Sequence, residues 1–384
     1  MASVGVSTHP VTALAAGEVI GQLLDAGARH ADLVVVGVTP AHGGALEDVA
    51  ATVARLVEPT VLVATVATDL LAVAAGAPVA SGSGRREAAG PAPGSPGPAA
   101  VAALAAAVGP VGGRVLPAGA DERVPPAPFE PAATLLFGAT TAAGPALRRA
   151  CAPDGSPAPV VLGGCGPGPV ALGRRAAGTG AAVAADLMTA PAVGSAVGLR
   201  PLGAPLPVDD VDGRVLLRLG GAPAFDRLVD QARDGVAASE LPELGAGLHL
   251  ERLGPDGRAD GAPIPVLGRQ GGGSGLALAR PVAVGELVRL LVRDAAALRR
   301  AGRSALQALG GGPATGAPGP PAVLVIGPPG LGRALGGERG PALPPTALLL
   351  ELPVQTAPGG AAGEPLQRAA VSALGLGGGT PSAP

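Results

Sequence analysis

The sequence lacks the residue types that would indicate a nucleic-acid-binding protein. It contains no Trp or Tyr and only three Phe in 384 residues, so the aromatic platforms on which proteins stack bases are missing. There is no Lys, which makes all 27 basic residues Arg, and there is no Asn. With a net charge of −2, the chain does not have the basic balance that binding to a phosphate backbone requires.

Cysteine and long apolar runs are also scarce. The two cysteines, Cys151 and Cys165, cannot form a disulfide framework. The chain does not open with a charged segment followed by an apolar one, so we expect a cytoplasmic protein. One stretch approaches membrane length, residues 60–80, but Asp69 lies near its middle. Because a charge at a bilayer centre costs about 2.5–3.5 kcal/mol, we predict no membrane association.

What is present is a large supply of small aliphatic residues. Hydrophobic residues make up 47% of the chain, and most of them are Ala, Val and Leu. A chain of this length and composition can bury a sizeable core and form two or three domains. The core must then be built from small side chains.

Strand and helix patterns alternate over the first 67 residues. Residues 3–8 and 32–39 read as strands, and the helix expected at 13–26 has apolar residues spaced 3.6 apart. A second helix at 46–57 precedes a third buried strand at 60–67. This order predicts a parallel sheet covered by helices.

The remaining chain has a more mixed pattern. It favours strands at 133–138, 160–163, 181–187, 212–219, 286–294, 323–327 and 347–352, and helices at 223–232 and 295–309. We interpret residues 201–207 as a connector. The prediction is therefore an α/β protein with a mainly parallel N-terminal sheet and flanking helices over 1–219. A mixed α/β region follows over 220–374, with a disordered tail over 375–384.

Polar side chains follow the first two predicted strands. Ser7, Thr8 and His9 come after the first strand, and Thr39 and His42 come after the second. In a parallel sheet these residues would share the carboxyl edge, where open α/β sheets bind ligands. Two histidines there could bind a carboxylate or exchange a proton. The alternative is a pair of solvated loop histidines.

A glycine-rich turn at 327–334 (GPPGLGRA) follows a strand, as a phosphate-binding loop does. Arg333 and Ala334 stand where that motif has Lys and then Ser or Thr. Arg333 could contact an anion, but an alanine cannot bind a metal ion. A tight turn is the alternative interpretation. The GGGSG segment at 271–275 has the same two interpretations, an anion cradle or a flexible loop.

Cys165 lies in another glycine-rich segment after a strand, where its thiol could be accessible. A reactive thiol needs a lowered pKa, and a small buried thiol is the alternative. No spacing of His, Cys, Asp and Glu matches a metal site. We therefore predict no metal and no cofactor.

Four segments together resemble the FIST domain family, which pairs an N-terminal and a C-terminal FIST region. They are GVST with ADLVVVGVTPAHGGALEDV, VVLGGCGPG at 160–168, RPLGAPLPVDDVDGRVLLRLGGAPAFDRL at 200–228, and VGELVRLLVRDA at 284–295. The chain departs from the family late, because VIGPPGLGR at 325–333 replaces a Cys-Asn-Gly-Arg-Gly segment.

The resemblance implies a sensory module in signal transduction that binds small ligands such as amino acids. No output domain follows in the sequence, so the signal would pass to a separate protein. On this basis we expect Ser7, Thr8, His9, Thr39, His42, Cys165 and Arg333 to bind a small polar ligand. Two alternatives remain: a degenerate scaffold that contacts a protein partner, and a hydrolase-type enzyme that uses His9 or His42 with Ser7 or Cys165.

Overall fold

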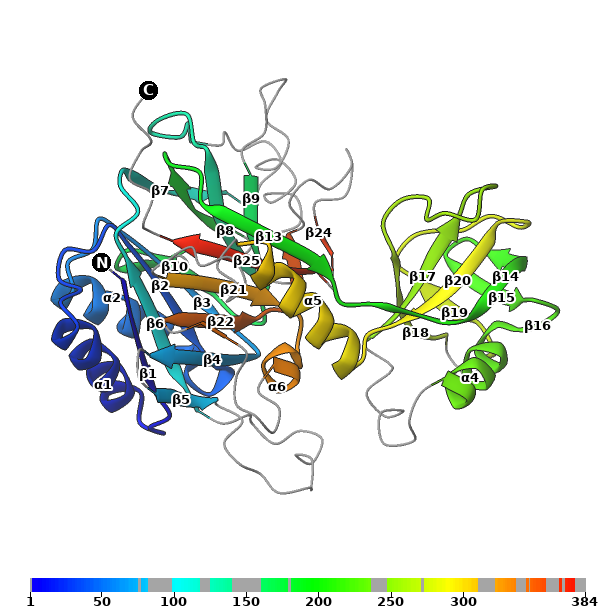
Figure 1. Cartoon of the computed structure of the whole chain (residues 1–384), viewed down its shortest axis with the longest axis horizontal. Helices are drawn as coiled ribbons and strands as arrows, with labels where there is room; N and C mark the ends of the chain where they lie inside the picture. Colours follow the sequence, from blue (N-terminus) through cyan, green and yellow to red (C-terminus); the bar gives the residue numbers. More distant parts are fainter. Residues whose placement is uncertain are drawn as a thin grey trace. The chain divides into compact units, whose positions relative to one another are not determined.

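The computed structural model divides the chain into two compact units (Figure 1). Unit 1 combines residues 1–196 and 299–384, and unit 2 comprises residues 197–298. The structure describes residues 2–74, 77–81, 99–117, 125–139, 160–178, 181–235, 247–270, 273–309, 322–335, 343–344, 346–356, 366–367 and 370–376. Within this part of the chain, no helix is long and apolar enough to cross a membrane.

Unit 1 contains three six-stranded sheets. The first sheet has the order β1 (Ala2–Ser7), β6 (Val101–Ala106), β2 (Leu33–Val38), β3 (Val61–Val66), β10 (Val170–Leu172) and β11 (Arg175–Ala176). The second has the order β7 (Val111–Leu116), β12 (Ala182–Leu187), β8 (Ala133–Ala139), β9 (Val160–Gly166), β23 (Val354–Thr356) and β24 (Leu366–Gln367). The third has the order β13 (Ala192–Val197), β25 (Ala370–Leu376), β21 (Ala322–Gly327), β22 (Ala347–Glu351), β4 (Asp69–Ala74) and β5 (Ala77–Ser81).

The three sheets have the same topology. Each has a parallel pair at its centre, which is β2–β3, β8–β9 or β21–β22. An antiparallel strand flanks the pair on both sides, with β6, β12 and β25 on one side and β10, β23 and β4 on the other. Unit 1 is therefore built from three copies of one strand arrangement.

Each copy gives a β-hairpin to another sheet. The hairpin β4–β5 follows β3 in the chain but completes the third sheet. The hairpin β10–β11 follows β9 and completes the first sheet, and β23–β24 follows β22 and completes the second. The exchange forms a closed cycle, so no copy can complete its own sheet.

The expectation of a mainly parallel α/β fold is wrong. In the described part of the chain, strand is about twice as frequent as helix, and the sheets are mixed or antiparallel. The main reason is β6, an alanine-rich strand that lies between β1 and β2 and pairs antiparallel with both. Alanine favours helix over strand, so only burial between two neighbours makes this segment extended.

Helices cover the outer face of the first sheet. They are α1 (Thr12–Asp25), the 3₁₀ helix η1 (Pro40–Ala45) and α2 (Leu46–Leu56), and both α-helices were predicted from their apolar spacing. The buried faces of α1 and α2 pack against the outward side chains of β2, β3 and β6.

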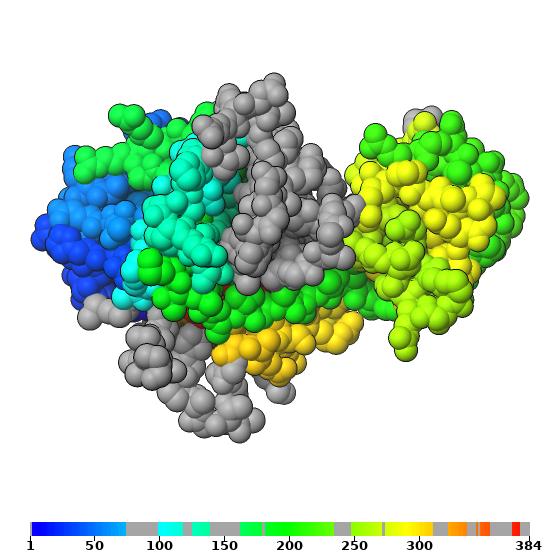
Figure 2. Space-filling view, turned by 90° about the horizontal axis from the view of Figure 1, so that it is seen from above, coloured from blue at the N-terminus to red at the C-terminus, as the bar shows by residue number. Residues whose placement is uncertain are grey.

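The later helices are α5 (Ala295–Gln307), which belongs to unit 1 from residue 299 onward, and α6 (Leu331–Leu335) of unit 1. Helix α5 packs against β13, where a Cβ on Gly194 would lie 1.8 Å from the carbonyl oxygen of Ala305. Figure 2 shows the two segments side by side at the surface, with β13 in green and α5 in yellow-orange. A glycine in β13 therefore allows the helix backbone to approach the strand closely.

One hydrophobic core joins the inner faces of all three sheets. It contains side chains such as Val35 of the first sheet, Phe137 of the second and Leu350 of the third. Most of its members are Ala, Val and Leu, as the composition predicts. Small side chains allow three sheets to approach one another closely around a single core.

Unit 2 is a closed antiparallel barrel of six strands. The ring runs through β14 (Arg200–Asp212), β20 (Leu287–Val292), β17 (Leu248–Leu253), β18 (Ile264–Arg269), β19 (Leu276–Leu278) and β15 (Val215–Leu219). A pairing of β14 with β15 closes it. The short strand β16 (Ala222–Pro223) and helix α4 (Ala224–Gly235) follow β15, and side chains of α4 belong to the barrel core.

Three predictions about segments of the chain can be compared with the observed elements. Residues 201–207, which the sequence indicated as a connector, are part of β14. Residue 220, the expected boundary between two regions, lies inside unit 2 between β15 and β16. Of the tail expected at 375–384, the first two residues belong to β25 and the others lie outside the described residues.

The chain crosses between sheets at the carboxyl ends of β3, β9 and β22. The three crossing segments are residues 66–69, 166–170 and 351–354. Thr68 donates from its amide (2.8 Å) and its hydroxyl (2.9 Å) to the carbonyl of Glu351, which ties the first crossing to the third. A Cβ on Gly166 would lie 1.9 Å from the carbonyl oxygen of Val66. The crossings therefore meet at one end of unit 1.

We predict that Gly166→Ala destabilises the protein by more than about 2 kcal/mol, because backbone rather than a flexible side chain blocks the new methyl group. The free energy of unfolding is measurable by urea denaturation followed by circular dichroism. The matched control is Gly17→Ala on α1, where nothing lies within 4 Å of the added methyl group. This change should stabilise the helix by up to about 1 kcal/mol. Equal stability of the two variants would contradict the close approach.

Candidate functional site

Five of the predicted residues lie at one edge of the first sheet. Ser7 is the last residue of β1, and Thr39 directly follows β2. The two strands are parallel to each other because each is antiparallel to β6, which lies between them. His9 is half-buried in the turn after β1, and His42 is buried in η1. Thr8 is exposed beside them.

Ser7 connects β1 to α1. Its hydroxyl donates to Oε2 of Glu18 over 2.5 Å and accepts from the backbone amide of His9 over 3.1 Å. In the same turn, Nδ1 of His9 accepts from the amide of Val11 over 3.0 Å. Ser7 is bound to a carboxylate and an amide, so these contacts do not form the serine–histidine pair that a hydrolase uses.

Thr39 holds η1 against the sheet. Its hydroxyl accepts from the amide of Ala100 over 2.9 Å, and its own amide donates to the carbonyl of Ala100 over 2.9 Å. The residue is 1% exposed. Thr39 therefore positions the following residues, including His42, rather than offering a free hydroxyl.

His42 has one ring nitrogen engaged and one without a partner. The residue is 1% exposed, and Nδ1 lies 2.8 Å from Oγ1 of Thr12. Among the residues that the structure describes, Nε2 has no hydrogen-bond partner. Burial lowers the pKa of His42, and the nearby charge of His9 adds to this effect while the His9 backbone opposes it. We therefore expect a neutral ring at neutral pH.

The glycine-rich turn at 327–334 binds a carboxyl group that belongs to the protein itself. Oε2 of Glu351 accepts from the amide of Gly330 over 2.8 Å, and Oε1 accepts from the amide of Gly332 over 2.7 Å. The interpretation as a phosphate-binding loop is therefore a poor fit, because a side-chain carboxylate already occupies the amide cradle. The tight-turn alternative fits better.

Arg333 belongs to this carboxylate cluster. It lies on α6, and its positive charge favours the ionised forms of both Glu351 and Asp69. Asp69 and Glu351 are directly opposite each other in the antiparallel β4–β22 pair. The structure therefore associates Arg333 with an acidic pair in the third sheet. Sequence reasoning missed this pair because its members lie far apart in the chain.

Both carboxyl groups of the pair are harder to ionise than usual. Burial raises the pKa of Glu351 to about 7, Asp69 adds to the rise, and the two glycine amides with Arg333 oppose it. Burial also raises the pKa of Asp69. Since Glu351 is 4% exposed, the pair can retain a proton near neutral pH.

We predict that Glu351 makes the protein less stable as the pH rises. The folded state favours protonated Glu351, so its contribution is complete below the ordinary glutamate pKa of 4.5 and is lost as the pH passes about 7. The loss should be on the order of 3 kcal/mol. Urea unfolding at pH 5 and pH 8 measures it, and Glu351→Gln should flatten the difference. Asp256→Asn, at an exposed carboxylate of the barrel, is the control. The same pH dependence in wild type and Glu351→Gln would contradict the assignment.

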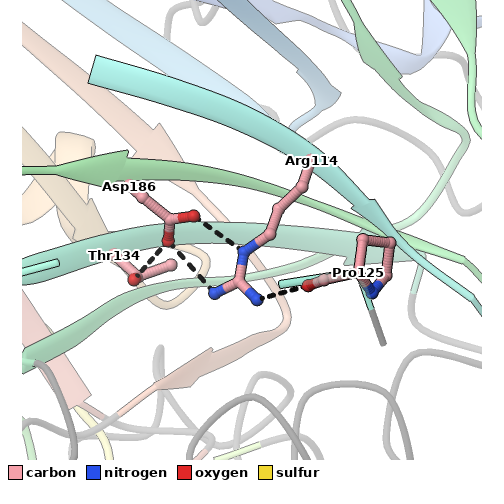
Figure 3. Close-up of polar contacts among 4 residues, drawn as sticks. All are labelled: Arg114, Pro125, Thr134 and Asp186. Carbon is pink, nitrogen blue, oxygen red and sulfur yellow. Dashed lines mark hydrogen bonds and ion pairs between the residues drawn. The ribbon is translucent and has the colours of Figure 1, made fainter. Parts of the chain in front are cut away.

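A second buried polar cluster joins three strands of the second sheet (Figure 3). Arg114 of β7 binds Asp186 of β12 through Nε–Oδ2 (2.7 Å) and Nη2–Oδ1 (3.2 Å). The hydroxyl of Thr134 on β8 donates to Oδ1 over 2.7 Å, and Nη1 of Arg114 donates to the carbonyl of Pro125 over 3.2 Å. Both oxygens of Asp186 are engaged and its side chain is fully buried, so the cluster is a structural clamp rather than a ligand site.

We predict that Asp186→Ala costs about 3–5 kcal/mol of unfolding free energy, because it leaves the charge of Arg114 buried without its partner. The double variant Arg114→Met with Asp186→Leu should lose much less, since both charges are replaced by apolar groups. Urea unfolding of the three proteins gives the comparison. Additive losses in the double variant would show that the clamp is not a coupled pair.

Of the two interpretations that the sequence left open for Cys165, the accessible turn does not fit the structure. The residue lies in β9 with 3% exposure, paired across the sheet with Val354. Burial raises the pKa of its thiol to about 12, so the thiolate needed for nucleophilic chemistry does not form at neutral pH. The buried-thiol alternative fits the structure. Cys151 lies outside the described residues.

The GGGSG segment at 271–275 is described only from Gly273 onward. There the amide of Gly273 donates to the carbonyl of Gln270 over 3.0 Å, and the amide of Gln270 donates to the carbonyl of Gly275 over 3.0 Å. These bonds make a turn between β18 and β19, as the loop interpretation predicts. In the described part of the chain, no three His, Cys, Asp or Glu side chains are grouped to hold a metal ion.

No protein-family model matches this chain, and no curated protein has significant sequence similarity to it.

Proposed function

We propose that the protein binds a small polar ligand at the edge formed by His9, Thr12, Glu18 and His42, and that it acts as a cytoplasmic sensory protein. The signal would pass to a separate signalling protein. Among the described residues, Nε2 of the buried His42 has no hydrogen-bond partner, and this observation carries the proposal. A buried polar atom without a partner costs free energy unless something else binds it. A ligand at this edge would supply the missing hydrogen bond.

The charges at this edge suit a zwitterion. Glu18 on α1 is exposed and carries a carboxylate that already accepts from Ser7. His9 is half-buried in the adjoining turn. A carboxylate can attract the ammonium group of an amino acid, while the imidazoles of His9 and His42 can donate to its carboxylate. This complementarity agrees with the amino-acid ligand that the resemblance to the FIST family implies.

We expect one class of amino acid to raise the unfolding temperature. Circular dichroism is the suitable probe of unfolding, because the chain has no Trp or Tyr to report it by fluorescence. At about 100 times its dissociation constant, a ligand adds about 2.7 kcal/mol to stability, which is a shift of several degrees for a protein of this size. A panel of the common amino acids and their decarboxylated and deaminated analogues would identify the groups that are recognised.

Two substitutions of the same histidine make the test specific. His42→Asn keeps an amide where Nδ1 contacts Thr12 but has no atom at Nε2, so the variant should fold and lose the ligand-induced shift. His42→Gln places an amide near the Nε2 position and should retain part of it. If no compound shifts the transition of the wild-type protein, or if His42→Asn retains the full shift, the proposal fails. The search would then turn to protein partners of a non-binding scaffold.

A further inference from the structure

A hollow lies at the opposite edge of the first sheet from His42. Its volume is about 100 Å³, and it is bounded by the start of β1, the end of β6 and the turn at 27–31. Alanine is the commonest residue in its lining, which includes Ala2, Ala28 and Ala105. The lining is more apolar than polar, and the small volume fits a ligand body of only a few carbon atoms.

One polar side chain in this wall has no partner. Ser3 of β1 is 5% exposed and lines the hollow. Its hydroxyl makes no hydrogen bond within the described part of the protein. A buried hydroxyl without a partner is costly, so a polar atom in the hollow would stabilise it.

Two of the residues that line the hollow, Arg29 and His30, are basic. Arg29 and His30 both contact Glu58, with Nη2–Oε1 at 3.5 Å and Nδ1–Oε2 at 3.3 Å. Glu58 thus uses one oxygen for each partner. Arg29 has five N–H donors, and its side chain is 64% exposed, so the site has donors left over. A surplus of donors next to an apolar wall favours an anionic ligand.

The backbone at this place is strained. His30 has φ of 60° and Glu58 has φ of 55°, and they are two of the three non-glycine residues with positive φ in the described part. Such conformations persist where the surrounding structure holds them, and they cluster at functional sites. Here the strained pair fixes the side chains that flank the hollow.

We propose that this hollow binds a small aliphatic carboxylate that carries a hydroxyl group. Arg29 binds the carboxylate through its guanidinium group. The alanine wall packs against the short carbon chain, and Ser3 exchanges a hydrogen bond with the ligand hydroxyl. This site is separate from the edge at His42, which lies at the other end of β1.

Lactate and propionate are the probes, because they differ by one hydroxyl group. Titration of the full-length protein, followed by saturation-transfer NMR on the ligand methyl signals, should show both binding, with lactate the tighter. Arg29→Gln should weaken both by at least about tenfold, the effect of losing a charged hydrogen bond. Ser3→Ala should weaken lactate and leave propionate within about twofold.

Three controls make the result decisive. Arg55→Gln, at an exposed arginine of α2 away from the hollow, should leave both affinities unchanged. Propionamide, which has no charge, should not bind. His42→Asn should also leave both affinities unchanged, which separates this site from the proposed amino-acid site. Failure of wild type to bind either probe, or binding that Arg29→Gln and Ser3→Ala do not alter, would overturn the proposal. Circular dichroism confirms that each variant is folded.

Discussion

The exchange of β-hairpins among three sheets is the constraint on which the rest of unit 1 depends. Each copy of the strand arrangement supplies the outer hairpin of a different sheet, so the three sheets must form together. The crossings that carry these hairpins bring the carboxyl ends of β3, β9 and β22 to one end of the unit. Small aliphatic side chains make the shared core possible. The residues at the carboxyl ends then have different chemistry in each copy.

This difference is clearest where each crossing begins. Val66, Gly166 and Glu351 are the last residues of β3, β9 and β22. The first copy places a buried histidine in the loop TPAHGGAL at 39–46, whereas the third has PPGLGRAL at 328–335, whose amides bind Glu351. One loop therefore leaves a buried nitrogen unpartnered among the described residues, while the amides of its counterpart bind the carboxyl group of Glu351. This contrast supports the first sheet, rather than the glycine-rich turn, as the place for a ligand.

The internal repetition left a signal in the sequence. The segment GGAL at 43–46 recurs as GPAL at 144–147 and GRAL at 332–335. AAVAAL at 99–104 recurs as AAVAAD at 181–186 and AAVSAL at 369–374. A search for repeats is the usual way to find such an architecture. These matches are hard to recognise, because alanine and glycine are so frequent in the chain that short repeats look accidental. The predicted strands and helices were mostly right, whereas the parallel sheet inferred from their order was wrong.

The sequence by itself determined the local elements. Apolar spacing placed α1 and α2, and unbroken apolar runs placed β2, β3, β21 and β22. It also placed Ser7, His9, Thr39 and His42 at a common edge, because strands joined through helices run parallel. Their role in binding stays a prediction. Only the tertiary structure decided which strands pair. In the folded protein, β6 lies between β1 and β2, and Asp69 lies opposite Glu351. Ser3 lines a hollow. Strand pairing depends on which distant edges are free and which faces must be buried, and the order of elements along the chain does not contain that information.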